Sequence, residues 1–141
     1  MSISALEALE KRRTVRQYDP DYQIPEDQLQ KIMHATQCSP TACDFQGQDY
    51  IVVTNKEKLA QLEKVVMDAL PEGEMKTHFK GRTERHGVKN VVTCDATTLV
   101  LFVKNERAAD LWVNVDVGIA SMGLMVAAQN FGIESMCLGI V

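Results

Sequence analysis

The feature of this sequence that most constrains its fold is a long stretch, residues 106–130, in which apolar and small side chains dominate. Asn105 could cap a helix that begins here, and Gly132 would end it. About 25 residues of helix span on the order of 37 Å, which exceeds what a small core needs. Small residues between positions 118 and 128 would let another helix approach closely. The stretch therefore predicts either a helix buried at a dimer interface or a central core helix of one subunit.

Hydrophobic periodicity places the other elements. Apolar residues three and four apart predict helices over residues 5–13, 25–39 and 56–70, and apolar runs predict strands over residues 49–55, 97–103 and 134–141. The near-continuous apolar run of the second strand suggests burial on both faces. Residues 71–94 are polar and contain several glycines, which is typical of a lid, a mobile excursion or an unrecognised helix. The expected fold class is α+β, with a central sheet flanked by helices in one domain over residues 1–141.

Composition narrows the class of protein. A net charge of -4 over 141 residues argues against general nucleic-acid binding, which needs a broad basic face. The longest apolar run, residues 117–128, is too short to span a bilayer, and the first residues do not resemble a signal peptide. Cysteines and histidines show no metal-ligand spacing. We expect a cytoplasmic protein with free thiols and no membrane or metal partner.

Three arginines near the N-terminus stand out in this acidic chain. Arg12, Arg13 and Arg16 occur within five positions at the predicted end of the first helix, in "KRRTVRQYDP". Guanidinium groups bind phosphate oxygens in bidentate fashion, so the cluster suggests a small anionic ligand. Arg12 and Arg16 would share a helix face if the helix extends that far. Alternatively, the cations only complement the helix dipole, at roughly 0.3 to 1 kcal/mol each.

Two further segments could contact a ligand. The stretch "SPTACDFQGQDY", residues 39–50, follows the second helix and carries Thr41, Asp44 and Gln46, although such polar segments are usually ordinary turns. Gly139 near the chain end would leave room for backbone N–H groups to face a ligand. Cys43 has no histidine partner evident in the sequence, so an inert thiol is the expected role.

Taken in order, three stretches resemble the FMN-dependent nitroreductase family. They are "RRTVRQYD", "SPTACDFQGQDYIVV" and "DVGIASMGLMVAAQNFGIESMCLG". The resemblance implies an intertwined homodimer that binds FMN, takes hydride from NADH or NADPH, and passes electrons to nitroaromatics or quinones by a ping-pong mechanism. A flavin-linked dehalogenase or another specialised reductase is an alternative within the same resemblance.

The resemblance also implies which residues bind the flavin. Arg12, Arg13 and Thr14 would meet the phosphate and ribityl end, and Arg16 would lie near the N1/O2 edge and tune the flavin electrostatically. The loop containing Asp44 would come from the other subunit, and the backbone near Gly139 would lie at the N5/O4 edge. No catalytic side chain is implied. The implied cofactor-binding residues are Arg12, Arg13, Thr14, Arg16, Pro40, Thr41, Ala42, Asp44, Gln46, Gly139 and Ile140.

Two departures from the family pattern keep another function open. Where family members often have Asn, Gln, Pro and Trp, this chain has Asp44, Gln46, Gly47 and Gln48. Family members also normally continue past the last glycine-bearing strand with a segment that carries further basic groups, whereas this sequence stops at Val141. A non-catalytic or impaired flavin-binding dimer is therefore the main alternative, and a plain interaction module is a third.

Overall fold

A computed structural model describes residues 3–139, and these residues divide into two compact units. The first unit comprises residues 3–14, 24–51 and 102–137. The second comprises residues 15–23, 52–101 and 138–139. Helices and strands occur together in the chain, so the predicted α+β class is confirmed.

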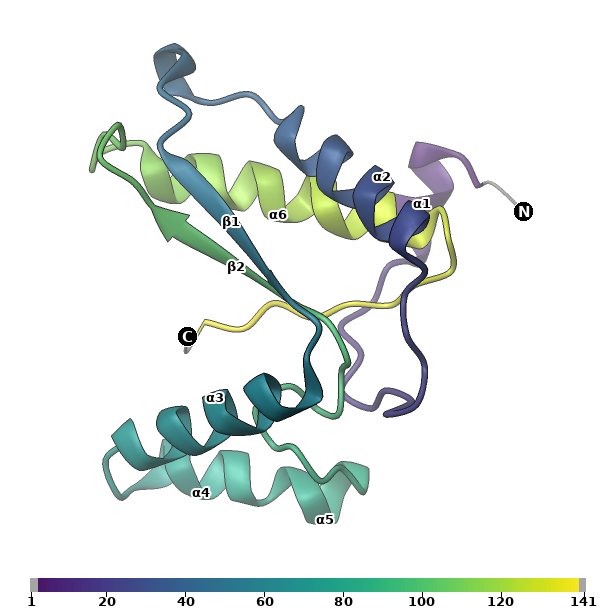
Figure 1. Cartoon of the computed structure of the whole chain (residues 1–141), viewed down its shortest axis with the longest axis vertical. Coiled ribbons are helices and arrows are strands. Elements are labelled where there is room, and N and C mark those ends of the chain that lie inside the picture. Colours follow the sequence, from purple (N-terminus) through teal and green to yellow (C-terminus); the bar gives the residue numbers. More distant parts are fainter. Residues whose placement is uncertain (1–2, 140–141) are drawn as a thin grey trace. The chain divides into compact units, whose positions relative to one another are not determined.

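The first unit is organised around α6, Val113–Gln129. This helix packs against α2, Glu26–Gln37, and against α1, Ala5–Lys11. Figure 1 shows α2 lying along α6, with α1 at the C-terminal end of α6. Apolar side chains from all three helices are withdrawn from solvent between them. They include Ala8, Leu29, Ile32, Ala120, Met125 and Ala128.

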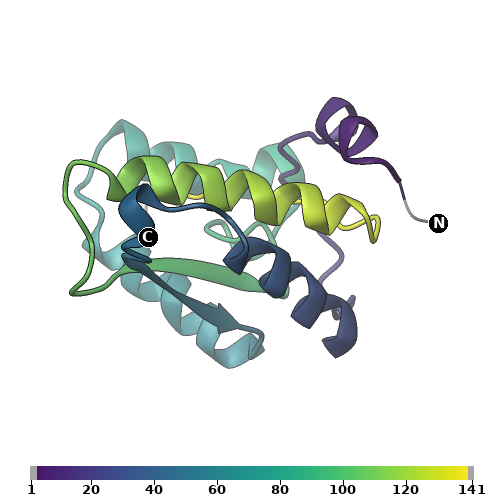
Figure 2. The same ribbon diagram turned by 90° about the horizontal axis from the view of Figure 1, so that it is seen from above.

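A two-stranded sheet connects to this helical layer. Strand β1, Gln48–Val53, follows the short 3₁₀ helix η1, Ala42–Asp44, and pairs with β2, Leu99–Lys104. The strands run in opposite directions, and the view in Figure 2 shows η1 near the N-terminal end of α6. Within residues 3–139, β2 pairs only with β1. Its side chains are half-buried or exposed, so the predicted burial on both faces is wrong.

The second unit is a small helical cluster. It contains α3, Lys56–Ala69, which Asn55 caps by accepting a hydrogen bond from the Lys58 N–H at 2.9 Å. Two short helices follow, α4, Glu74–Lys80, and α5, Arg82–His86. The hydrophobic core of this unit consists of Val66, Phe79, Val91 and Val92. Residues 71–94 therefore contain helices that the sequence analysis did not recognise.

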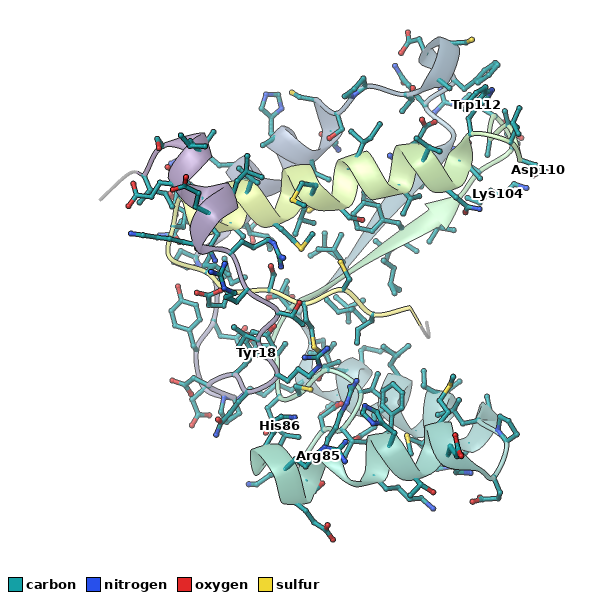
Figure 3. All side chains as sticks on the ribbon, turned by 180° about the vertical axis from the view of Figure 1, so that it is seen from behind. Tyr18, Arg85, His86, Lys104, Asp110 and Trp112 are labelled. Carbon is teal, nitrogen blue, oxygen red and sulfur yellow. The ribbon has the colours of Figure 1, made fainter. Side chains whose placement is uncertain are left out.

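The expected start of the long helix is wrong. Helix α6 begins at Val113 rather than near residue 106, because Asn105 instead forms a tight turn by accepting the Arg107 N–H at 3.0 Å. Lys104 pairs with Asp110 across this connection, and Figure 3 shows both residues near the start of α6. At its 17 residues, α6 spans about 26 Å.

The third predicted strand is absent from the described part of residues 134–141. Residues 134–139 make only an isolated parallel bridge, between Ser135 and Thr14, and positions 140 and 141 lie outside the described residues. Among residues 3–139, no helix combines the length and apolar character that crossing a bilayer requires.

Candidate functional site

The loop that connects α2 to β1, residues 39–47, has an unusual backbone. The backbone φ angles of Cys43, Asp44 and Gln46 are 48°, 52° and 47°. These values lie in the left-handed region, which residues other than glycine rarely adopt. Such conformations persist only where the surroundings hold them, and they cluster at ligand sites. We call residues 39–47 the strained loop.

Helix α6 holds the first half of the strained loop. Both carboxylate oxygens of Asp116 accept the Ala42 N–H, at 3.1 and 3.3 Å, and Asp116 is only 5% exposed. Two turns further along α6, a Cβ added to Gly123 would lie 2.9 Å from the Ser39 hydroxyl oxygen. The first half of the loop therefore packs closely against the surface of α6.

The segment before α6 holds the second half. Asn105 donates from its side-chain amide to the Gln46 carbonyl at 3.0 Å, and its backbone N–H donates to the Gly47 carbonyl at 3.1 Å. A Cβ on Gly47 would lie 2.5 Å from the Ala108 Cα, so only glycine fits there without a backbone shift.

Hydrogen bonds within the strained loop fix its tip. The Gln46 N–H donates to the Thr41 hydroxyl at 3.0 Å, and the Gln46 side-chain amide donates to Asp44 at 3.0 Å. Residues 43–46 are nevertheless exposed to solvent. The loop is thus anchored at both ends while its tip is presented outward, which is the arrangement expected of a binding loop on a rigid scaffold.

The arginine segment is not helical. Helix α1 ends at Lys11, with Arg12 as its C-cap, and Thr14 forms the bridge to Ser135. The helix therefore does not extend far enough for Arg12 and Arg16 to share one of its faces. Thr14 instead lies beside the segment that leaves the C-terminal end of α6.

Arg12 and Arg13 differ in what they contact. Arg13 donates from Nη1 to the carbonyls of Glu10 and Arg12, at 2.7 and 2.8 Å, so it covers the C-terminal end of α1 as a helix-end cation does. Within residues 3–139, the ion pairs to carboxylates are all formed by lysines and none by an arginine. Arg12 is half-buried, and its guanidinium forms none of these ion pairs.

Arg16 belongs to the second unit, where other cations surround it. The Tyr18 N–H donates to the Cys94 carbonyl at 3.2 Å, which brings this segment beside Cys94. Burial raises the pKa of the Cys94 thiol, and the positive charges of Arg82 and Arg16 oppose that shift. Arg82 is 7% exposed and donates to the Val91 carbonyl at 2.8 Å. Arg16 is exposed, so its guanidinium is accessible in a locally positive region.

Within the first unit, the two candidate segments lie at opposite ends of α6. Ala42 is held by Asp116 in the first turn of the helix, whereas Thr14 pairs with Ser135 beyond its last turn. From Asp116 to the last residue of the helix, Gln129, α6 spans about 20 Å. The Ala42 anchor and the Thr14 bridge therefore lie near different ends of α6.

The remaining predicted positions add less. Gly139 is exposed, and a Cβ added there would meet nothing within 4 Å, so the backbone beside it is open. Ile140 lies outside the described residues. Residues 3–139 contain no group of three or more side chains that could hold a metal ion.

Asp116 and Asn105, the two residues that anchor the strained loop, were not predicted as part of a site, and Asn105 was expected only to cap a helix. Asp116 carries a detectable signal, since it is the lone charged residue in the mostly apolar stretch "VNVDVGIASMGL". A buried charge in such a stretch is expected to have a partner. Its partner is a backbone N–H 74 positions away, which no sequence pattern marks.

The exposed strained loop and the arginine segment are the two features of residues 3–139 that suit the binding of a small ligand. The family follows from comparison with known proteins. The model of the nitroreductase family matches residues 9–141, so the chain belongs to that family.

Individual relatives agree with this assignment. A protein of Methanothermobacter thermautotrophicus, provisionally named an NADH dehydrogenase/NAD(P)H nitroreductase, is 30% identical over 138 residues. The match covers 98% of this chain but 62% of that relative, so the chain spans less than two thirds of its length.

Solved structures share the fold. A nitroreductase from Bacteroides fragilis with bound FMN is 28% identical, with a TM-score of 0.78 over 96% of this chain and 69% of the other. A nitroreductase from Desulfitobacterium hafniense, also with bound FMN, has a TM-score of 0.82 at 19% identity, over 99% and 72% of the two chains.

Proposed function

We propose that this chain forms the FMN-binding part of an oxidoreductase that takes electrons from NADH or NADPH and delivers them to nitroaromatics or quinones. Membership of the nitroreductase family supports the class of reaction. The FMN in the Bacteroides fragilis structure supports the cofactor, and the name of the archaeal relative supports the nicotinamide donor. The observation that carries the proposal is the set of arginines without carboxylate partners in residues 3–139.

The residues of the arginine segment fit the phosphate end of FMN. Arg12 offers an unoccupied guanidinium, and Thr14 offers an exposed hydroxyl two positions further on. Donors of this kind suit a dianionic phosphate, because charge-assisted hydrogen bonds are about twice as strong as neutral ones. Arg13 would contribute to the same end by leaving the α1 carbonyls that it now covers.

The other proposed contacts surround the isoalloxazine. Arg16 would place a positive charge at the N1/O2 edge, where charge develops on reduction. Backbone groups near Gly139 and Ile140 would face the N5/O4 edge. The strained loop would contribute its backbone and small polar groups through Pro40, Thr41, Ala42, Asp44 and Gln46.

FMN, when bound, accepts and releases the electron pair of a hydride, so the chain needs no catalytic acid or nucleophile of its own. The protein's part is to bind the phosphate, orient the ring and supply the positive charge of Arg16. One ring face used in turn by the nicotinamide and the acceptor predicts ping-pong kinetics.

The active form is proposed to be a homodimer. The Ala42 anchor and the Thr14 bridge lie near different ends of α6, which supports a flavin site that takes the loop and the arginine segment from two subunits. The exposed side of α6 also carries an apolar stripe. Its members are Trp112, Val115, Ile119 and Met122, each 40% exposed or more.

A charge on this stripe tests the homodimer. Ile119→Asp should produce monomers in sedimentation at micromolar concentration and lose FMN binding together with the dimer, although Ile119 is not a proposed flavin contact. Val65→Asp is the matched control, because Val65 is 65% exposed on α3. A parent protein that sediments as a monomer would contradict the proposal.

Purified protein tests the activity itself. We expect a visible flavin spectrum, and loss of NADH or NADPH absorbance when a nitroaromatic or a quinone is added. A flavin spectrum without nicotinamide oxidation would favour the non-catalytic flavin-binding dimer. Absence of flavin after FMN addition and dialysis would overturn both proposals. Turnover of a halogenated aromatic instead would indicate the dehalogenase alternative.

A further inference from the structure

Asp116 is the one buried carboxylate of α6, whose other buried side chains are those of Ala120, Met125, Ala128 and Gln129. Burying a charge is unfavourable unless hydrogen bonds or an opposite charge compensate. Within residues 3–139 no cation forms an ion pair with it, and both oxygens converge on the single N–H of Ala42. The carboxylate therefore serves the strained loop rather than a salt bridge.

The position of that hydrogen bond matters for the loop. Ala42 is the first residue of η1, and the two residues after it, Cys43 and Asp44, both have positive φ. Thr41 provides no side-chain cap to η1, so the Ala42 N–H depends on Asp116. Releasing it would remove the restraint next to the least favourable backbone of the loop.

We propose that Asp116 is a positioning residue of the flavin site: its carboxylate holds the Ala42 N–H and thereby keeps the strained loop in the conformation that contacts FMN. This inference rests on the proposed function, because it assigns the loop to FMN. Asp116 does not itself touch the cofactor. It acts through the backbone of a loop that its own helix anchors.

Asp116→Asn is the direct test, since it keeps the shape of the side chain. The amide has one acceptor oxygen, and its NH₂ group would oppose the Ala42 N–H in the place of the second oxygen. We expect faster hydrogen exchange at the amides of residues 42–46. We also expect FMN to bind about tenfold more weakly, which corresponds to about 1.4 kcal/mol.

Thr36→Val is the matched control. Thr36 is fully buried in the same unit, but its hydroxyl donates to the Ile32 carbonyl of its own helix, at 2.8 Å. The control should lose some stability to urea without changing loop exchange, FMN affinity or the visible circular dichroism of the bound flavin. Asp116→Asn at saturating FMN should change that dichroism, a change that a general loss of stability does not produce.

A second variant removes the donor instead of the acceptor. Ala42→Pro lacks the N–H, and proline is tolerated in the first turn of a helix. Because both changes break one hydrogen bond, the double variant should bind FMN no more weakly than the poorer single variant. Additive losses would overturn the inference, and so would unchanged loop exchange in Asp116→Asn.

The two proposals fail in different ways. Faster loop exchange with unchanged FMN affinity and dichroism would overturn the role of Asp116 while leaving the flavin assignment intact. A parent protein that binds no FMN would overturn the proposed function and, with it, the role of Asp116 at the flavin. The exchange data would then still report whether Asp116 orders the loop.

Discussion

Replacing Arg12 by alanine should weaken FMN binding much more than replacing its neighbour Arg13. The two guanidinium groups differ in the protein without ligand. Arg13 already donates to the carbonyls of Glu10 and Arg12, whereas no hydrogen bond or ion pair occupies the Arg12 guanidinium within residues 3–139. A phosphate contact is therefore a net gain for Arg12, but for Arg13 it replaces an existing contact.

The size of the effect follows from this difference. A hydrogen bond to a charged group contributes about 1.5 to 3 kcal/mol, so Arg12→Ala should raise the Kd for FMN about 10- to 150-fold. Arg13→Ala should raise it less. It should instead lower the free energy of unfolding by about 0.3 to 1 kcal/mol, because it removes the cation at the end of α1.

Fluorescence titration with FMN and with riboflavin separates the phosphate from the rest of the flavin. Riboflavin has the same ring and ribityl chain but no phosphate, so Arg12→Ala should leave its affinity unchanged. Equal losses for both ligands would mean that Arg12 acts on the fold or on the ring. Unchanged FMN affinity would refute the phosphate assignment.

Four other changes test separate parts of the molecule. Arg16→Met should lower the flavin midpoint potential and slow reduction by NADH while FMN stays bound, because it removes the cation proposed at N1; equal stopped-flow rates for variant and parent would refute this tuning. Gly47→Ala should lower the free energy of unfolding in urea by about 1 to 3 kcal/mol, because its Cβ would clash with the Ala108 backbone. Gly118→Ala should raise the free energy of unfolding of a monomer by up to about 1 kcal/mol, because alanine favours a helix more than glycine does and nothing lies within 4 Å of the added Cβ. A lower affinity between subunits in this variant would instead place Gly118 at the dimer interface. Burial raises the pKa of Glu63 above 4.5, so the folded state holds this proton more tightly than the unfolded chain does. The contribution of Glu63 to the free energy of unfolding should therefore fall as the pH rises through about 4.5 and beyond. Glu63→Gln should remove this pH dependence in urea unfolding.

Elements with local end signals could be predicted from the sequence. Ser4 accepts the Glu7 N–H at 3.1 Å, and Asn55 accepts the Lys58 N–H, so the starts of α1 and α3 depend on neighbours in the chain. Helix α2 likewise begins directly after Pro25 and ends before Pro40. These boundaries are determined by residues only a few positions away, which explains why pattern reading finds them.

Elements without such signals were missed or misplaced. Helices α4 and α5 are short and mostly polar, and α4 is held to its unit through the buried side chain of Phe79. A single buried position gives no periodicity to detect. Helix α6 was predicted too long because the cap residue Asn105 turns its side chain toward Gln46 and Asp49 instead of starting a helix.

The candidate site divides in the same way. Arginine side chains can be recognised in the sequence as candidates for binding an anion. A loop that binds through its backbone cannot be recognised in this way, because its conformation depends on distant residues. Here the restraint comes from Asp116, 74 positions from Ala42. The same helix carries the exposed stripe that includes Ile119 and, just past its other end, the partner of Thr14. A shift of α6 would therefore move the loop anchor, the proposed subunit contact and the arginine segment together. This coupling is a physical reason why the sequence around α6 constrains the fold of the chain more than any single binding motif does.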